Sequence, residues 1–264
     1  MKKIILILVG IFTIFSFSQS DKKKLQDAIE EEFLTNCAAK YPYTTRMTEW
    51  QNCLDQGLKK DSTIAHLWQQ KAMPYYKARK YEVGLPFLDK AVKFDAPRWQ
   101  SYRAFMKCIF AKNYKDAITD FEDCKKKFGN GYVMDHSYDF YIAISYLQLN
   151  KYEKAKKLLK NYVDEMYEKR DKLEHPTALF YLGIAEYELR NHEDAIVQFD
   201  KALKIYPQFS EVKYYKGVCE SRLGRTEIRE KLWKEAEEDY KKGFKLNEDN
   251  TIYETYPYQL RWNK

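Results

Sequence analysis

Glycine and proline are scarce in this sequence, with 9 Gly and 7 Pro among 264 residues. Runs that alternate apolar and polar residues, which are typical of half-buried strands, are also few. Sheets with many tight turns need both features, so their scarcity argues against an all-β fold. Apolar residues instead recur at three- and four-residue intervals through most of the chain, and this spacing predicts an all-α fold.

The sequence also lacks the motifs of common catalytic sites. It contains no G-x-S-x-G, no H-E-x-x-H and no Gly-rich phosphate loop. The four histidines show no metal-ligand spacing with cysteines or carboxylates; they are His66, His136, His175 and His192. We therefore expect a non-enzymatic protein with no cofactor and no metal site.

A basic stripe of the kind that binds nucleic acid is missing as well. The chain has 46 Lys and Arg against 39 Asp and Glu, a formal net charge of +7. The lysines alternate with acids and gather toward the expected C-terminal ends of helices, where cations offset the helix dipole. Nucleic acid is therefore not an expected partner.

Residues 1–18 have the pattern of a cleaved signal peptide. Two lysines precede an almost wholly apolar run from Ile4 to Phe15, and Ser16 and Ser18 offer small residues for cleavage before Gln19. The apolar run is shorter than the roughly 20 residues of a membrane span, although an uncleaved anchor is the alternative. We expect a periplasmic or secreted protein with no membrane span after cleavage.

The five cysteines are consistent with an oxidising compartment. Cys37 and Cys53 lie on the two helices of one expected hairpin at similar heights, so a disulfide between them is plausible. Cys108 and Cys124 have the same separation but match less well in height, and free buried thiols are favoured there. Cys219 is left over in either case.

One stretch, Thr177 to Pro207, organises the rest of the chain. It is expected to form two short amphipathic helices joined by a polar turn. Its spacing resembles the tetratricopeptide (TPR) repeat of 34 residues, which places Leu-Gly, Ala, Phe, Ala and Pro at fixed positions. The residues at those positions are Leu182-Gly183, Ala195, Phe199, Ala202 and Pro207. The resemblance implies a right-handed α-solenoid of about six TPR-like hairpins over residues 19–248, followed by a capping tail over 249–264.

The other expected hairpins match the same repeat positions to different degrees. Residues 65–98 match well. A further unit covers His136 to about Lys169, with its second helix extending toward Leu173. In 31–64 a hairpin is expected, but Trp50 stands where the family has a small residue. In 98–131 the aromatic stripe packs inward only if the turn has lost one residue; otherwise it faces the groove. The last unit begins at Ser210, and we expect seven extra helical residues at 226–232 to make its second helix project beyond the first.

The resemblance also implies a functional surface, the concave groove lined by the first helix of each repeat. Residues at the family's groove positions form a ladder of aromatic and apolar side chains. They are Gln69, Met73, Tyr76, Tyr102, Phe140, Ile144, Phe180, Ile184, Tyr187, Tyr214 and Arg222. The Lys and Asn that clamp carboxylates in some family members are absent. Alternatively, these rings pack between neighbouring repeats.

These patterns favour a scaffold that binds a protein or peptide partner in the groove by apolar burial and ring stacking. A glycan-binding module of the cell envelope is the first alternative, because exposed Tyr and Trp stack on sugars. An accessory subunit of an exported enzyme or secretion complex is the second.

Overall fold

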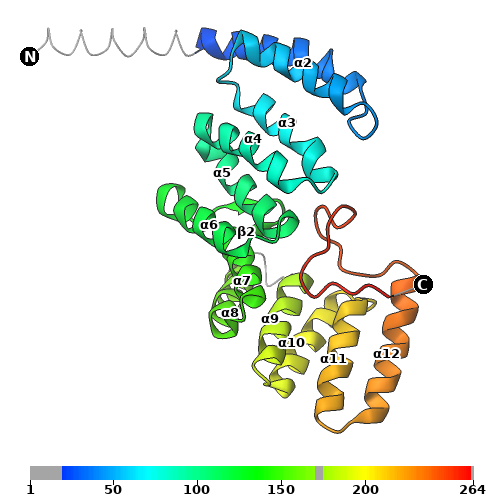
Figure 1. Ribbon diagram of the computed structural model, residues 1–264. Coiled ribbons are helices and arrows are strands. Elements are labelled where there is room, and N and C mark those ends of the chain that lie inside the picture. Colours follow the sequence, from blue (N-terminus) through cyan, green and yellow to red (C-terminus); the bar gives the residue numbers. More distant parts are fainter. Residues whose placement is uncertain (1–19, 170–174, 263–264) are drawn as a thin grey trace, which may run out of the picture. The chain divides into compact units, whose positions relative to one another are not determined.

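The computed structural model describes residues 20–169 and 175–262, and these confirm the all-α prediction. Antiparallel helical hairpins follow one another along the chain (Figure 1). The expected signal peptide, residues 1–18, lies outside the described residues. No helix in the described part combines the length and apolarity that a membrane crossing requires.

The chain divides into two compact units, with the boundary between Trp99 and Gln100. Unit 1 begins with a helix over residues 20–30, which leads without a break into a π-helical turn. Its further elements are η1 (Glu31–Thr35), η2 (Ala38–Lys40), α2 (Met47–Lys60), α3 (Ala65–Lys77), α4 (Tyr81–Phe94) and the start of α5 (Ala96–Phe105).

The first hairpin of unit 1 has its own core and a disulfide. Trp50 is buried and donates its indole N–H to the Gln70 carbonyl at 3.3 Å, so a large ring fills the place of the family's small residue. Cys37 and Cys53 form the disulfide that the sequence indicates, with their Cα atoms 5.8 Å apart. The cluster around them joins the first helices to α2 and α3; its buried members are Ile29, Phe33, Ala38, Trp50, Cys53, Leu54, Leu58, Ile64 and Leu67.

Unit 2 continues α5 and contains the remaining hairpins. Its elements are η3 (Met106–Phe110), α6 (Tyr114–Phe128), β1 (Tyr132–Val133), β2 (His136–Ser137), α7 (Tyr138–Gln148), α8 (Tyr152–Lys169), α9 (Pro176–Glu188), α10 (His192–Ile205), α11 (Ser210–Arg222) and α12 (Thr226–Lys241). The strands form a short antiparallel ribbon before α7, with Val133 opposite His136. Helix α8 is long, as expected, up to Lys169; the expected extension over 170–173 lies outside the described residues.

The hairpin of α9 and α10 shows why these residues pair. The buried face of α10 carries Ala195, Phe199 and Ala202, at the spacing of an amphipathic helix. Gly183 on α9 lies so close to Phe199 that a Cβ built on it would be 2.4 Å from the ring. Small residues therefore bring the two axes together, and the Phe199 ring fills the space that they leave.

A π-helical turn resolves the register of the third hairpin. Five residues, Met106–Phe110, form π-helix between α5 and the turn to α6. This wide turn adds one residue, so that Ala104 takes the buried small-residue place that uniform α-helix would give to Phe105. The aromatic stripe consequently packs inward, but the shift arises within the helix and not from a shortened turn.

The prediction of seven extra residues in the last hairpin is wrong. Helix α12 begins at Thr226, directly after the turn, and Trp233 lies 34 positions after Phe199. Trp233 packs on Gly217 as Phe199 packs on Gly183, and a Cβ added to Gly217 would lie 2.7 Å from the indole ring. The repeat length is therefore unchanged. Arg229 replaces the small residue found at Ala195, and its guanidinium lies 5.1 Å from the Trp233 ring centre.

Candidate functional site

The residues of the predicted groove fall in both units. Gln69, Met73 and Tyr76 belong to unit 1. Tyr76 is buried beneath Tyr81 at the heart of the second hairpin, with its ring 2.8 Å or less from the position of a Cβ on Gly84. Gln69 is also buried, and Met73 is half-buried. This part of the ladder therefore offers little open surface.

In unit 2, the central part of the ladder is core. Phe140, Ile144, Phe180 and Ile184 each have 0% of their surface exposed, so the prediction that they line an open groove is wrong. Helices α7 and α9 are buried on nearly every side, because they have neighbours on both flanks and a third layer over their concave face. Tyr102, Tyr187 and Tyr214 are half-buried, whereas Arg222 at the end of α11 is exposed.

The third layer is the segment 246–262, called here the tail. It has no regular secondary structure. It crosses α9 and α11, the first helices of the last two hairpins (Figure 1). The Tyr181 hydroxyl on α9 donates to the Pro257 carbonyl at 2.9 Å, and the Lys112 ammonium donates to the Thr255 carbonyl. The concave face therefore binds the tail partly through its backbone. These contacts lie on more than the last hairpin, because Lys112 precedes α6 and Tyr181 belongs to α9.

Aromatic side chains hold the tail at the α11 end. Tyr258 donates its hydroxyl to Glu188 at 2.8 Å and lies edge-on to Tyr215. Trp262 lies edge-on to both Tyr214 and Tyr240. The predicted groove residue Tyr214 and its neighbour Tyr215 thus contact aromatic rings. The sequence suggests such contacts with a partner, but here the rings belong to the tail of the same chain.

The start of the tail is fixed by buried carboxylates. Glu211 on α11 accepts the Leu246 N–H at 2.9 Å and the Ser210 hydroxyl at 3.0 Å, and burial raises its pKa. Glu248 accepts a hydrogen bond from His136 Nε2 at 2.8 Å. Burial by itself would raise the pKa of Glu248, but the hydrogen bond and charge of His136 outweigh it, so that this pKa is lowered.

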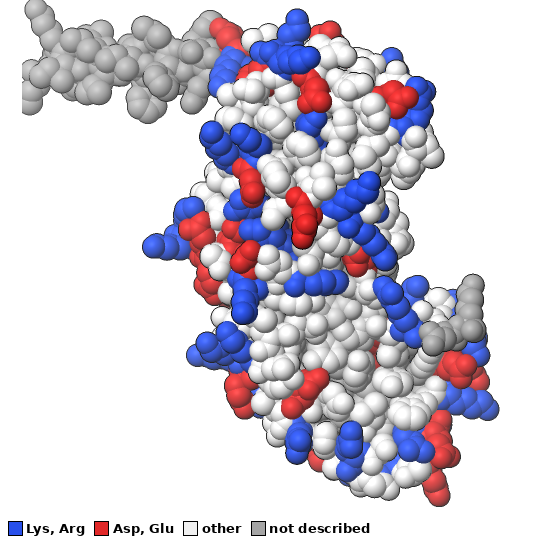
Figure 2. Space-filling view, viewed as in Figure 1, with Lys and Arg blue, Asp and Glu red and all other residues white. Residues whose placement is uncertain are grey.

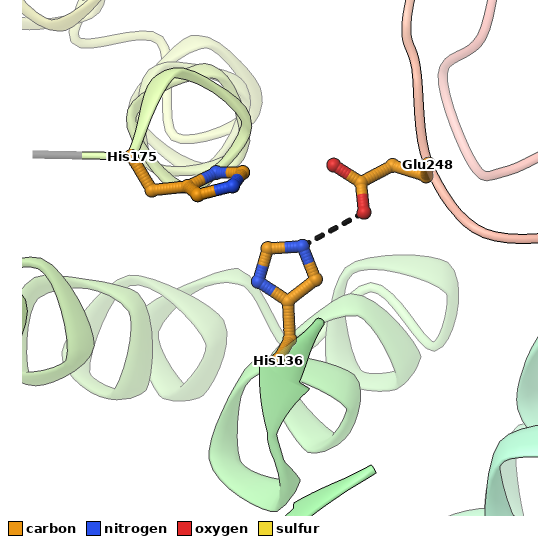
Figure 3. A group of neighbouring side chains, drawn as sticks. All are labelled: His136, His175 and Glu248. Atoms are coloured by element: carbon orange, nitrogen blue, oxygen red, sulfur yellow. Dashed lines mark hydrogen bonds and ion pairs between the residues drawn. The ribbon is translucent and has the colours of Figure 1, made fainter. Parts of the chain in front are cut away.

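Histidine side chains from two other elements meet Glu248. His136 comes from β2, and His175 precedes α9 as its N-cap (Figure 3). One potential ligand atom from each of the three residues lies within 4.8 Å of the others. Sequence reasoning missed this group because His136 and Glu248 are 112 residues apart and no local spacing connects them.

An open pocket adjoins the tail at the end of α9. It has a volume of about 340 Å³ and brings two predicted groove residues together; its lining is Tyr187, Glu188, Arg190, His192 and Arg222. Burial and the charges of Arg222 and Arg190 lower the pKa of His192 below its ordinary value of 6.5. The pocket is therefore locally electropositive, although Glu188 also lines it.

The remaining cysteines are buried thiols. Cys108, Cys124 and Cys219 are free, and burial raises the pKa of the Cys108 thiol to about 11 and of the other two to about 12. Such thiols are poor nucleophiles at neutral pH and pack as small apolar residues.

On the face that Figure 2 shows, acidic and basic side chains are intermixed in small groups.

This sequence and fold were compared with those of known proteins. Residues 142–210 match the model of a tetratricopeptide repeat family. No curated protein sequence gave a significant match. Many solved structures are similar in fold.

MamA (residues 41 to the end) from Desulfovibrio magneticus RS-1 has a TM-score of 0.57 and 16% identity, covering 67% of this chain and 96% of its own. PilW, described as a widely conserved type IV pilus biogenesis factor, has a TM-score of 0.62 and 11% identity, covering 82% and 94%. YrrB, described as a TPR protein with an unusual peptide-binding site, has a TM-score of 0.51 and 18% identity, covering 70% and 91%. Residues 142–210 thus match tetratricopeptide repeats, and the consecutive helical hairpins share the fold of solved proteins of that kind.

Proposed function

We propose that this protein is a non-enzymatic scaffold outside the cytoplasm that binds an extended segment of a partner protein on the concave face of unit 2. The observation that carries the proposal is the tail itself. The face formed by α9 and α11, together with Lys112, holds a non-helical segment by hydrogen bonds to its backbone and by aromatic contacts. A surface that holds one non-helical segment in this way has the chemistry to hold another.

The partner segment would enter from the pocket at Tyr187 and Arg222 and replace the contacts of residues 255–262. The electropositive character of this pocket favours a segment that carries a carboxylate beside an aromatic ring. Arg222 lines the pocket and offers a guanidinium for such a carboxylate. This mode of binding retains Tyr187, Tyr214 and Arg222 as contact residues and leaves the buried members of the ladder as their support.

The location outside the cytoplasm is supported by two features. One is the signal-like pattern of residues 1–18. The other is the disulfide between Cys37 and Cys53, a bond that persists mainly in oxidising compartments.

A selection for peptide ligands tests the proposal. The chain from Gln19 onward would be screened against a phage-displayed library of random peptides, and the affinity of enriched peptides measured by fluorescence anisotropy. The comparison variant is Tyr187→Ala with Arg222→Ala. The control is Lys160→Ala, which removes an exposed ammonium paired with Asp164 on α8.

We expect enriched peptides to bind the double variant at least about tenfold more weakly than the native chain, a loss of about 1.4 kcal/mol, and to bind the control normally. Bound peptide should also speed hydrogen exchange in residues 255–260, because the tail is displaced. The proposal fails if no peptide is enriched, or if the native chain and the double variant bind equally well. Binding of soluble glycans at the same residues would support the glycan-binding alternative instead.

A further inference from the structure

We propose that His136, His175 and Glu248 form a binding site for a divalent transition-metal ion, with Zn²⁺ as the best match. This inference does not depend on the proposed function. The three residues come from β2, the start of α9 and the tail, so a bound ion would join three separate segments of unit 2 (Figure 3).

The chemistry of the three side chains fits such an ion. Two imidazoles and one carboxylate are a known ligand set for zinc in proteins, and they leave a fourth position for water. Zinc lies about 2.0–2.2 Å from such ligands, so ligand atoms around it are about 3.4 Å apart in tetrahedral geometry. In the structure the three ligand atoms lie within 4.8 Å of one another, and His136 Nε2 is 2.8 Å from Glu248 Oε2. A bound ion would therefore need this pair to move slightly apart and His175 to move closer.

The groups around the ligands are those that a metal site uses. Nδ1 of His136 lies 3.0 Å from the Tyr162 hydroxyl, so Nε2 is directed at Glu248. When an ion replaces the proton between Nε2 and the carboxylate, Nδ1 carries a proton and donates it to Tyr162. Such an outer partner fixes the imidazole ring and its tautomer. The Phe140 ring, stacked on His136 with centres 3.7 Å apart, holds the imidazole from one side.

The Nδ1 atom of His175 makes a long hydrogen bond. It accepts the Thr177 N–H at 3.3 Å, the length of a weak hydrogen bond. Ligation through Nε2 would place a proton on Nδ1 and break this bond, at small cost. His175 is also partly exposed, which leaves it able to turn toward the other two ligands.

Glu248 supplies an independent observation. Its side chain is 2% exposed, and its Oε1 is buried with no hydrogen bond of acceptable geometry among the described residues. The Thr177 side chain lies close enough to lower the pKa of Glu248 but does not satisfy this oxygen geometrically. A buried carboxylate oxygen with an unsatisfied lone pair is unfavourable, and a coordinated cation would remove that cost.

An entry path exists on the side of His175. A pocket of about 560 Å³ is lined by His175 and Thr177, together with Leu246 and Asn247 of the tail. Its volume is large enough to hold a hydrated ion beside His175. His136, in contrast, is fully buried, so among the described residues the open approach is on the His175 side.

Metal analysis of the native chain and one matched pair of variants tests this site. The chain from Gln19 onward would be stripped with EDTA, dialysed against ZnCl₂ and measured by inductively coupled plasma mass spectrometry. The test variant is His175→Gln. The control is His66→Gln, because His66 also pairs with a glutamate, Glu30 at 2.8 Å, but does not belong to the group of three.

We expect one tightly bound zinc per native chain, the same in His66→Gln, and loss of stoichiometric binding in His175→Gln. Co²⁺ in place of Zn²⁺ should give the visible absorption of a tetrahedral site in the native chain and the His66→Gln control, and none in His175→Gln. Tyr162→Phe, which removes the outer hydrogen bond, should weaken binding about 10–100-fold.

Two results would overturn the proposal. The first is a native chain that binds no stoichiometric zinc and shows no cobalt spectrum. The second is a His175→Gln variant, shown by circular dichroism to be folded, that binds zinc as tightly as the native chain. In either case His136, Tyr162 and Glu248 form a buried hydrogen-bond network only.

Discussion

At the scale of single residues, close contacts between helices decide what can be substituted. Gly183 and Gly217 occupy corresponding places on α9 and α11, each under an aromatic ring of the following helix. Neither is needed for its backbone conformation, because both lie within regular helix. Their role is to leave room for the ring, so even one added methyl group must displace it.

Gly183→Ala is expected to destabilise the protein by about 1–3 kcal/mol through overpacking. The added Cβ would be 2.4 Å from Cε1 of Phe199, which is fully buried and cannot move freely. Urea unfolding followed by circular dichroism measures the change. Val197→Ala on the exposed face of α10 should have almost no effect, and equal stability of the two variants would contradict this account.

His192 gives a prediction of pH dependence. Its pKa should lie below 6.5, because burial and the charges of Arg222 and Arg190 disfavour the protonated ring. Arg222→Ala should raise the pKa of His192. A carboxylate bound to the native protein should also raise the pKa of His192. Affinity for a carboxylate ligand should then increase as the pH falls through the pKa of the complex. NMR titration of the imidazole measures each value, and an unchanged pKa in Arg222→Ala would exclude the proposed electrostatic coupling.

At the scale of elements, the disulfide of the first hairpin shows how a covalent link can stabilise a hairpin that departs from the repeat pattern. It joins Cys37 to Cys53 across 16 positions and holds the first helix against α2. This hairpin is short and departs from the repeat pattern at Trp50. A covalent link limits the conformations that its unfolded chain can adopt.

Replacement of both Cys37 and Cys53 by Ala should destabilise unit 1 by about 3 kcal/mol, the value for a loop of this length. Thermal unfolding monitored by hydrogen exchange of α2 and α3 measures the effect. The Cys219→Ala variant, which removes a buried thiol in unit 2, controls for loss of a cysteine as such. Unchanged exchange in α2 after removal of the disulfide would show that the bond contributes nothing to stability.

The elements also show how far the sequence can be interpreted. Helical spacing and small residues such as Ala202 suffice to place most helices, because one buried face repeats every three or four positions. The π-helical turn at Met106–Phe110 has no comparable signal, since it changes the register without changing the composition. The last hairpin is misaligned by the repeat pattern because Arg229 replaces a small residue, although Trp233 keeps the 34-residue interval from Phe199.

The site is harder to predict for a different reason. The family's groove positions identify which residues lie on the concave side, and Tyr187 with Arg222 do meet in a pocket there. Whether that side is open depends on the tail, whose sequence has no repeat pattern. The contacts of Glu248 with His136 depend on tertiary structure alone, so no spacing rule could reveal them.

At the scale of the whole molecule, the tail changes how unit 2 is stabilised. A solenoid without such a segment has contacts only between neighbouring repeats. Here Lys112, Tyr181 and Tyr214, from three different hairpins, contact one continuous segment. Stability should therefore be shared across unit 2 to a greater degree than in a simple array of hairpins.

Tyr256→Ala tests this sharing. Tyr256 is 2% exposed, and loss of a buried aromatic side chain costs about 3–5 kcal/mol. Hydrogen exchange should accelerate in α7, α9 and α11 together, while α3 and α4 of unit 1 keep their protection. Ile252→Ala, at an 84% exposed tail position, should change little. An effect confined to one hairpin would show that the tail does not couple the others.

The sequence separation of the tail contacts has a consequence for folding order. Each hairpin closes through short loops, whereas Lys112 must wait for Thr255 and His136 for Glu248, across 143 and 112 residues. Local contacts form faster than contacts of high sequence separation. Hairpins of unit 2 should therefore form first, and docking of the tail should be the slow last step. Until then the tyrosines of α9 and α11 are accessible, and in that interval a chaperone could compete for the face that the tail later covers.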